Sequence, residues 1–320
     1  MRILIVKTSS LGDVVHMLPA ITDAARAIPN LTVDWVVEEN FQAVPSWHPN
    51  VNQIFPVAIR RWRKCLLSPT TFKEIKNSRN QIRAIEYDAI IDSQGLFKSS
   101  ILTHWANGPR FGYDKNSARE PMSRWAYDQH LNVSRELHAI ERNRQITSKA
   151  LGYSSAELAL SYGLDNLIER LPATLELKLP ENYVIGLHGT SRPDKEWAEK
   201  NWTELSTWLD QQATPLILPW GNQREHDRAH RIAENSNAVV LPKLDLNSLA
   251  QIISGASAVV GMDTGLMHIA AALAKPGVAI YPVTQPALTG VCSETQAPAI
   301  TNFEGLVSSE MVIEQLKVYS

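Results

Sequence analysis

Short apolar runs alternate with stretches of helical periodicity along nearly the whole chain, and this alternation limits the possible folds more than any other feature. The runs are rich in Val and Ile, whereas the stretches between them carry apolar residues three and four positions apart. Strands that alternate with helices in this way are typical of a parallel, doubly wound sheet. We therefore predict an α/β protein with strands at 3–6, 33–37, 53–57, 183–188, 215–220, 238–241, 257–262 and 277–283, and a further strand in the AII core of YDAIIDSQG (87–95), which runs into a turn.

The alternation weakens between residues 151 and 182, where Gly and Pro are scattered through a mixed sequence. A chain of 320 residues is also long enough for two domains of about 150 residues, each with its own core. We predict an N-terminal domain over 1–165, a linker over 166–182 and a second domain over 183–306. Ligands of such sheets bind beyond the carboxyl ends of the strands, so the strand-to-helix turns are the candidate sites.

Composition excludes several classes of protein. No segment offers the roughly 20 apolar residues of a membrane-spanning helix, and the first apolar run is too short for a signal peptide. Cys65 and Cys292 have no paired spacing, which favours a reducing compartment and excludes a cysteine-type zinc site. The net charge is only −2, yet residues 60–83 hold eight basic residues and one acid, Glu74. Such a segment indicates a polyanionic partner.

The first strand ends in the turn TSSLGD (8–13), which resembles a nucleotide-binding loop but has one glycine of the three in G-x-G-x-x-G. Asp13 also places a negative charge where a phosphate would need the free N–H groups of the helix start. Two interpretations remain open from these residues alone. Asp13 is either a first-turn aspartate that stabilises its own helix by about 1 kcal/mol, or a general base aimed into a substrate site.

The turn HGTSRPDKEW (188–197) carries groups suited to a phosphate. Backbone N–H groups and the Thr190 and Ser191 hydroxyls can hold it, and Lys195 can balance the charge of a departing diphosphate. The alternative is a solvated loop in which Lys195 pairs with Asp194 or Glu196.

A second phosphate cradle is predicted where VVGMDTGLMHIAAAL passes from strand to helix. Thr264 and Gly265 present N–H groups at the helix start, next to Asp263. His268, one turn further on, is either a packed helix residue or a ligand contact. Aspartic proteases also contain D-T-G, but they pair two copies in an all-β fold, whereas this chain has one copy on a strand-to-helix turn.

The turn LPWGNQREHDRA (218–229) puts Glu225 in the first turn of a helix. A carboxylate there can accept both hydroxyls of a ribose, or it can stabilise its own helix. The sequence E-x-D at 225–227 is the nearest approach to a metal-binding D-x-D, and no His/Glu cluster has metal-ligand spacing. We therefore predict a mechanism without a metal.

The basic segment begins with RRWRK (60–64) and continues through Lys73, Lys76, Arg79 and Arg83. Arginine suits bidentate capture of phosphate or carboxylate, and tryptophan favours a membrane interface. The segment has no nucleic-acid recognition motif, and its domain is only mildly basic, so we expect no nucleic-acid partner. An acidic lipid headgroup fits better, with a merely solvated helix face as the alternative.

Several long blocks, in order along nearly the whole chain, resemble the ADP-heptose:lipopolysaccharide heptosyltransferases of glycosyltransferase family 9. They are MRILIVKTSSLGDVVHMLPAITDA, WVVEENFQAVPSWHPNVNQIFPVAIRRWRK, HGTSRPDKEW, LPWG and VVGMDTGLMHIAAAL. The resemblance implies a GT-B fold, in which two Rossmann-like domains face a cleft. It places the donor in the C-terminal domain, the acceptor in the N-terminal one, and a last helix, here within 307–320, back on the N-terminal domain.

The reaction implied is inverting transfer of L-glycero-D-manno-heptose from ADP-heptose to the first Kdo of Kdo2-lipid A, without metal or cofactor. By the same resemblance Asp13 is the base and Lys195 neutralises the departing diphosphate. The other donor contacts it implies are Thr190, Ser191, Thr264 and Gly265 to phosphate, Glu225 to ribose, Leu244 to adenine, and Asp263 and His268 to heptose. The acceptor contacts it implies are Ser10, Gly12, Arg60, Arg61, Arg63 and Lys64. Pro193 and Glu196 differ from the family pattern.

Two alternatives are kept. One is a related heptosyltransferase that acts on a heptosylated acceptor. The basic block RRWRK fits the more anionic Kdo-lipid A acceptor better than this alternative. The other is a non-catalytic protein that binds a nucleotide sugar or an anionic lipid. We expect the protein in the cytoplasm, peripheral on the cytoplasmic face of the inner membrane through residues 60–83.

Overall fold

The chain forms two compact units, Met1–Leu164 and Asp165–Ser320. The structure is a computed structural model, and it describes residues 1–171, 177–190, 192–234, 236–294 and 299–319. Each unit has its own parallel sheet and its own buried core. Within these residues, no helix combines the length and the apolar character that crossing a membrane requires.

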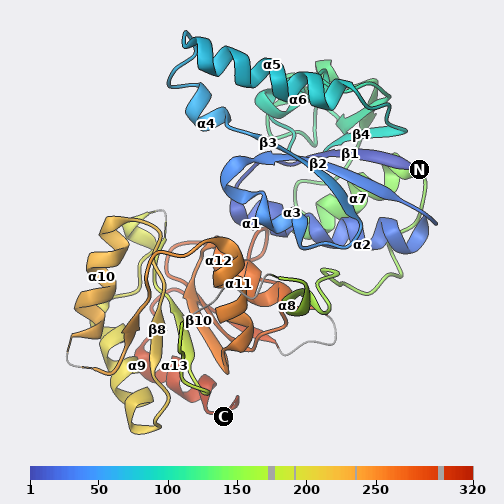
Figure 1. The fold of residues 1–320 in the computed structure, drawn as a ribbon. Coiled ribbons are helices and arrows are strands. Elements are labelled where there is room, and N and C mark those ends of the chain that lie inside the picture. The colour runs from blue at the N-terminus through green and yellow to red at the C-terminus, as the bar shows by residue number, and fades with distance from the viewer. Residues whose placement is uncertain (172–176, 191, 235, 295–298, 320) are drawn as a thin grey trace. The chain divides into compact units, whose positions relative to one another are not determined.

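The sheet of the N-terminal unit has six parallel strands in the order β3-β2-β1-β4-β5-β6. Ile3, Leu4, Ile5 and Val6 of the central β1 are fully buried, because α5 and α6 lie over one face of the sheet and α2, α3 and α7 lie over the other (Figure 1). The strands are β1 (Arg2–Val6), β2 (Thr32–Glu38), β3 (Val51–Val57), β4 (Ala89–Asp92), β5 (Arg110–Tyr113) and β6 (Gln129–Leu131).

The helical stretch after β1 is broken into α1 and α2, and Pro19 lies in the first turn of α2, where a missing N–H is tolerated. Buried Asp23 of α2 accepts a 2.6 Å ion-paired hydrogen bond from Arg144 Nε of α7 and ties the two helices together. The helices of this unit are α1 (Leu11–Val15), α2 (Leu18–Ala27), η1 (Glu39–Phe41), α3 (Ala43–Ser46), α4 (Ile59–Trp62), α5 (Pro69–Arg83), α6 (Phe97–Thr103), η2 (Pro121–Ala126) and α7 (Ala139–Leu151).

The C-terminal unit repeats the plan with the strand order β12-β11-β10-β7-β8-β9, all parallel. Its strands are β7 (Val184–Leu187), β8 (Leu216–Leu218), β9 (Val239–Val240), β10 (Ala258–Met262), β11 (Gly277–Tyr281) and β12 (Ile300–Glu304). Its helices are α8 (Leu167–Arg170), η3 (Pro193–Lys195), α9 (Glu199–Gln211), α10 (Gln223–Ala233), α11 (Leu246–Gly255), α12 (Gly265–Ala272) and α13 (Ser309–Leu316).

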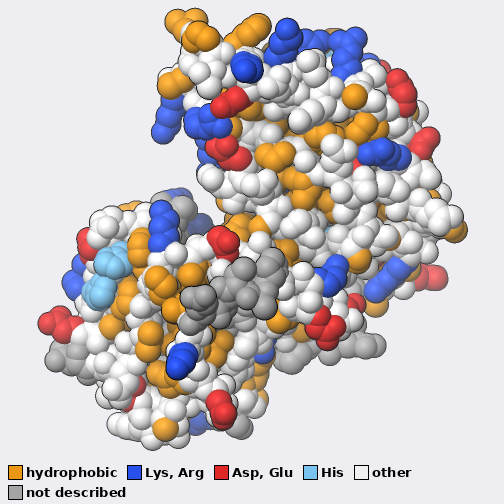
Figure 2. All heavy atoms as spheres, in the orientation of Figure 1, with side chains coloured by type: hydrophobic (Ala, Val, Ile, Leu, Met, Phe, Trp, Pro, Cys, Tyr) orange, Lys and Arg blue, Asp and Glu red, His pale blue; other side chains and the backbone are white. Residues whose placement is uncertain are grey.

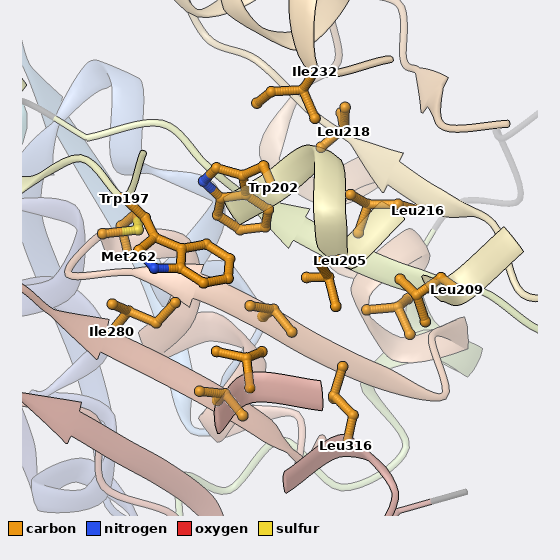
Figure 3. Close-up of a cluster of buried hydrophobic side chains, with 14 of the residues drawn as sticks. Trp197, Trp202, Leu205, Leu209, Leu216, Leu218, Ile232, Met262, Ile280 and Leu316 are labelled. Atoms are coloured by element: carbon orange, nitrogen blue, oxygen red, sulfur yellow. The ribbon is translucent and has the colours of Figure 1, made fainter. Parts of the chain in front are cut away.

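Two tryptophans stand at the centre of the C-terminal core (Figure 3). The rings of Trp197 and Trp202 meet edge to face, with centroids 5.1 Å apart and planes at 81°. Trp197 Nε1 donates a 2.7 Å hydrogen bond to the carbonyl oxygen of Val307. Because Trp197 ends the loop that carries Lys195, the core anchors that loop.

The last helix belongs to the C-terminal unit. Val312 and Leu316 of α13 are buried in the same core as Trp202, and Ser309 Oγ donates to Glu204 of α9 at 2.5 Å. These contacts lie within the C-terminal unit, and the return of this helix to the N-terminal domain stays a prediction of the family resemblance. Its apolar side chains are already buried against α9 and β11.

Candidate active-site residues

Asp13 is half-buried in α1, directly after β1. Its Oδ2 accepts two hydrogen bonds, from the Ser10 backbone N–H and from Ser10 Oγ, both at 2.8 Å. These contacts confirm that Asp13 stabilises its own helix. Both bonds end on Oδ2, so within the described part of the chain Oδ1 keeps its lone pairs for a ligand.

A buried lysine lies near Asp13. Lys7 Nζ donates to the Ser93 carbonyl oxygen at 3.0 Å and to Asn143 Oδ1 at 3.4 Å. Burial lowers the pKa of Lys7, while the charges of Asp13 and Asp92 oppose that shift. Sequence reasoning missed Lys7, although a lysine that directly ends the apolar run RILIV was a usable signal.

Gln94 connects the turn after β1 with the turn after β4. Its Oε1 accepts from the Thr8 N–H at 2.9 Å and from Thr8 Oγ1 at 2.7 Å, and its Nε2 donates to the Ser9 carbonyl oxygen at 3.0 Å. The Gln94 N–H is held in turn by buried Asp92 Oδ1 at 2.8 Å. Burial raises the pKa of Asp92, although four hydrogen bonds oppose the shift. Two turns far apart in sequence thus fix the backbone before Asp13.

A cavity of about 670 Å³ opens beside Asp13 within the N-terminal unit. Three cationic side chains line it, from Arg63, Lys98 and Arg119. Its full lining is Ser9, Ser10, Asp13, Arg63, Gln94, Leu96, Phe97, Lys98, Ile101, Arg119 and Glu120. The two carboxylates of the lining are Asp13 and Glu120, and Glu120 Oε2 accepts a hydrogen bond from the Phe97 N–H at 2.7 Å. Asp13 next to three cations suits an anionic ligand with a hydroxyl to deprotonate.

The structure brings only part of the predicted acceptor set to this cavity. Ser10 and Arg63 line it, whereas Gly12 is buried in α1 and Lys64 is exposed outside the lining. Arg61 Nη1 and Nη2 are 2.9 Å from Glu74 and 3.0 Å from Glu39, so its charge is already paired.

Arg60 is also committed elsewhere. The Arg60 backbone N–H donates to Glu38 Oε1 at 2.9 Å, and the guanidinium carbon of Arg60 lies 5.5 Å from the centre of the Phe41 ring. Lys98 and Arg119 were missed, because isolated basic residues carry no local pattern that marks them.

In the C-terminal unit, Lys195 Nζ lies 2.6 Å from Asp263 Oδ2, which also accepts from Thr284 Oγ1 at 3.0 Å. Turns that follow three different strands meet at this carboxylate. The alternative in which Lys195 pairs with Asp194 or Glu196 is wrong, since Asp194 pairs with Arg192 and Glu196 with Arg224.

The predicted phosphate-binding groups lie at two turns of this unit. Thr190 is buried, and among the described residues its Oγ1 has no hydrogen-bond partner. Thr264 is the N-cap of α12, but its side chain makes no capping hydrogen bond, and Gly265 is the first helical residue. Buried His268 follows one turn later. Ser191 lies outside the described residues.

Glu225 is in the first turn of α10, as predicted. Its Oε2 accepts from the Gly221 N–H at 2.7 Å and its Oε1 from Asn222 Nδ2 at 2.8 Å. A Cβ at Gly189 would lie 2.8 Å from Glu225 Cδ, so any larger residue at Gly189 would displace this carboxylate. Leu244 is half-buried between β9 and α11.

Arg228 holds the two ends of the loop after β7. Its Nη1 donates to the His188 carbonyl oxygen at 2.6 Å, and its Nη2 donates to the Trp197 carbonyl oxygen. Burial, followed by the charge of Arg228, lowers the pKa of His188 to about 4. Sequence reasoning missed this arginine, because the carbonyl groups that it binds come together only in the fold.

No three His, Cys, Asp or Glu side chains gather as a metal site within the described ranges. A pair of doubly wound parallel sheets, each followed by polar turns at the carboxyl ends of its strands, defines the GT-B class of α/β glycosyltransferase. The chain belongs to glycosyltransferase family 9 (heptosyltransferase), whose family model matches residues 75–311. It is thus an enzyme of the heptosyltransferase type.

Individual relatives agree with this family. The chain is 43% identical, over 99% of each sequence, to lipopolysaccharide heptosyltransferase 1 of Escherichia coli K12. It is similar to the solved structure of E. coli heptosyltransferase WaaC with ADP, at a TM-score of 0.92, 39% identity and 100% coverage of both chains. The same enzyme with ADP-2-deoxy-2-fluoro heptose gives a TM-score of 0.88 at the same identity and coverage.

Proposed function

We propose that this enzyme moves L-glycero-D-manno-heptose from ADP-heptose to the first Kdo of Kdo2-lipid A, with inversion and without a metal, at the cytoplasmic face of the inner membrane. The observation that carries the proposal is the cavity that joins Asp13 to three cationic side chains. Kdo carries a carboxylate and lipid A carries phosphates, so the acceptor has the charge that this cavity requires. Similarity to lipopolysaccharide heptosyltransferase 1 and to WaaC with a fluoro-heptose analogue supports a lipopolysaccharide acceptor and an ADP-heptose donor.

Asp13 acts as the base. A carboxylate oxygen takes the proton of the acceptor hydroxyl as the hydroxyl oxygen attacks the anomeric carbon of the heptose. The bond from that carbon to the β-phosphate oxygen breaks, and ADP leaves with the electron pair. The Ser10 hydrogen bonds hold the other oxygen of Asp13 and fix the direction of the base.

Lys195 stabilises the ADP that leaves. In the structure it is paired with Asp263, so we expect the diphosphate to compete for the ammonium group and Asp263 to turn to the heptose hydroxyls with His268. Thr190, Thr264 and Gly265 offer hydroxyl and N–H donors to the phosphates. Ser191 is assigned the same role by the family resemblance alone.

The nucleoside is held by the neighbouring turns. Glu225 accepts hydrogen bonds from the ribose hydroxyls, and half-buried Leu244 packs on the adenine. On the acceptor side, Arg63, Lys98 and Arg119 bind the carboxylate and phosphates, with Ser10 and Gly12 at the turn. Arg60, Arg61 and Lys64 act at longer range, since the guanidinium of Arg61 is paired with Glu39 and Glu74 and that of Arg60 lies over the Phe41 ring.

Asp13→Asn tests the base, because asparagine keeps an oxygen that can accept from Ser10. We expect the variant to fold and bind ADP-heptose, with kcat lowered about 10²- to 10⁴-fold. Asp114→Asn, at another turn of the same unit, is the control and should keep normal turnover. A rate near wild type for Asp13→Asn would refute the role of base.

ADP release separates the candidate functions. Purified protein is mixed with ADP-heptose and either Kdo2-lipid A or a heptosylated acceptor. Release with Kdo2-lipid A alone supports the proposal, and release with the heptosylated acceptor alone supports the related transferase. Binding of ADP-heptose without release in either mixture would leave a non-catalytic binding protein.

A further inference from the structure

The segment that joins α4 to α5 exposes three large apolar side chains. Leu66 is 62% exposed, Leu67 is 100% exposed and Phe72, in the first turn of α5, is 69% exposed. The backbone that carries them is ordered by hydrogen bonds from the Ser68 N–H to Cys65 O at 3.1 Å and from the Phe72 N–H to Ser68 O at 3.0 Å. We call Leu66, Leu67 and Phe72 the apolar tip; it lies at the α4–α5 end of the N-terminal unit, where Figure 2 shows apolar and basic side chains together.

Basic side chains continue from the tip along one face of α5. Lys76, Arg79 and Arg83 follow Phe72 by four, seven and eleven positions, a spacing that lines them up on a helix. All three are exposed, and in the described part of the chain none of them forms an ion pair. Glu74, the single acid of the segment, is already paired with Arg61 at 2.9 Å. We call Lys76, Arg79 and Arg83 the basic stripe.

We propose that the N-terminal unit docks on an anionic phospholipid bilayer, with the apolar tip inserted at the boundary of headgroups and acyl chains and the basic stripe on the lipid phosphates. The segment has no nucleic-acid recognition motif, whereas exposed apolar residues beside unpaired cations are what binding to an anionic membrane surface requires. This inference adds a membrane-binding surface to the proposed function. It rests on that function, because a lipid acceptor in the membrane is the reason for docking.

The acceptor cavity adjoins the same element. Arg63 is the C-cap of α4 and lines the cavity, so the chain passes from the cavity to the tip within three residues. Phe97 and Ile101 of α6, 52% and 45% exposed, form part of the cavity lining. Docking through the tip would therefore bring the cavity to a membrane-embedded lipid acceptor.

Exposed Cys65 offers a probe beside the tip. In a Cys292→Ser background it is labelled with an environment-sensitive fluorophore and mixed with phosphatidylglycerol/phosphatidylethanolamine vesicles that hold no acceptor. We expect a blue shift and quenching by lipids brominated on their acyl chains. Vesicle binding without either change would overturn insertion, and no binding would overturn docking.

Substitutions separate the tip from the stripe. Leu66→Ser/Leu67→Ser/Phe72→Ser should lower the vesicle partition coefficient about 100-fold, the loss expected for three partly buried apolar side chains. Lys76→Gln/Arg79→Gln should lower it roughly 30-fold and weaken its dependence on salt. Val283→Ser/Leu288→Ser/Leu306→Ser removes exposed apolar residues of the C-terminal unit and should change nothing. Equal losses for this control and the tip variant would refute the proposal.

Turnover distinguishes docking from catalysis. The tip variant should keep its rate on a water-soluble, deacylated acceptor and lose rate on the same acceptor embedded in vesicles. An equal loss on both would overturn the docking role. A wild-type protein that binds vesicles but releases ADP with neither acceptor would refute the proposed function and leave the docking surface standing.

Discussion

Asp13 shows how one side chain serves both its helix and a site. The sequence left two interpretations open, helix stabilisation and catalysis, and the hydrogen bonds to Ser10 confirm the first. They do not compete with the second, because both bonds end on Oδ2. Stabilisation of the helix also orients the carboxylate, so the group proposed as base is held in place before substrate arrives.

His188 should make stability depend on pH. Its pKa is about 4 in the folded chain against 6.5 for the free side chain, so the unfolded chain binds more protons between these values. Unfolding free energy should therefore fall by about 2 kcal/mol between pH 7 and pH 5. Urea unfolding followed by tryptophan fluorescence measures it. His188→Gln should remove this contribution, whereas exposed His230→Gln should retain it; an unchanged slope in His188→Gln would contradict the assignment.

At the scale of elements, the loop between β7 and α9 illustrates how a helix elsewhere in the unit controls a binding turn. Arg228 of α10 donates to the carbonyl oxygens of His188 and Trp197, which begin and end the loop. Thr190 and Lys195 lie between these two residues. Arg228 touches neither substrate in the proposed mechanism, so it is a positioning residue.

Arg228→Met should therefore loosen the loop. We expect ADP affinity, measured by calorimetry, to fall by about 10²-fold because the phosphate-binding groups are misplaced. Unfolding free energy should fall by about 3 kcal/mol as well, so binding is measured where circular dichroism shows a folded chain. The control is Arg231→Met, also on α10, which removes an exposed pair with Glu199 of α9. Normal ADP affinity in folded Arg228→Met would contradict the positioning role.

The sequence predicted the central strands and their turns because buried strands are nearly continuous Val and Ile runs. It missed β5, β6 and β12, whose sequences RFGY, QHL and ITNFE mix polar and apolar residues at or near the edges of the sheets. Asp13, Lys195, Glu225 and Asp263 could be singled out as candidates because each lies at a strand-to-helix turn. The partners Gln94 and Arg228 were not, since contacts over long sequence separations leave no local pattern.

At the scale of the whole molecule, each unit has its own sheet, core and candidate site. The proposed donor contacts all belong to Asp165–Ser320, and the proposed acceptor contacts all belong to Met1–Leu164. Charge follows the same division: the most basic segment, residues 60–83, lies in the N-terminal unit. Each substrate should therefore stabilise the unit that binds it.

Calorimetric unfolding with and without ADP tests this division. Separate cores should unfold in two transitions, of which ADP shifts only that of the C-terminal unit. At 100 times its Kd the ligand adds about 2.7 kcal/mol to the free energy of unfolding, which corresponds to roughly 5–10 °C in Tm for a unit of this size. Glu225→Ala should reduce the shift because it removes the ribose contact, whereas Arg63→Ala should leave it intact. A shift of both transitions by the same amount would mean that the two units unfold as one and that ADP stabilises both.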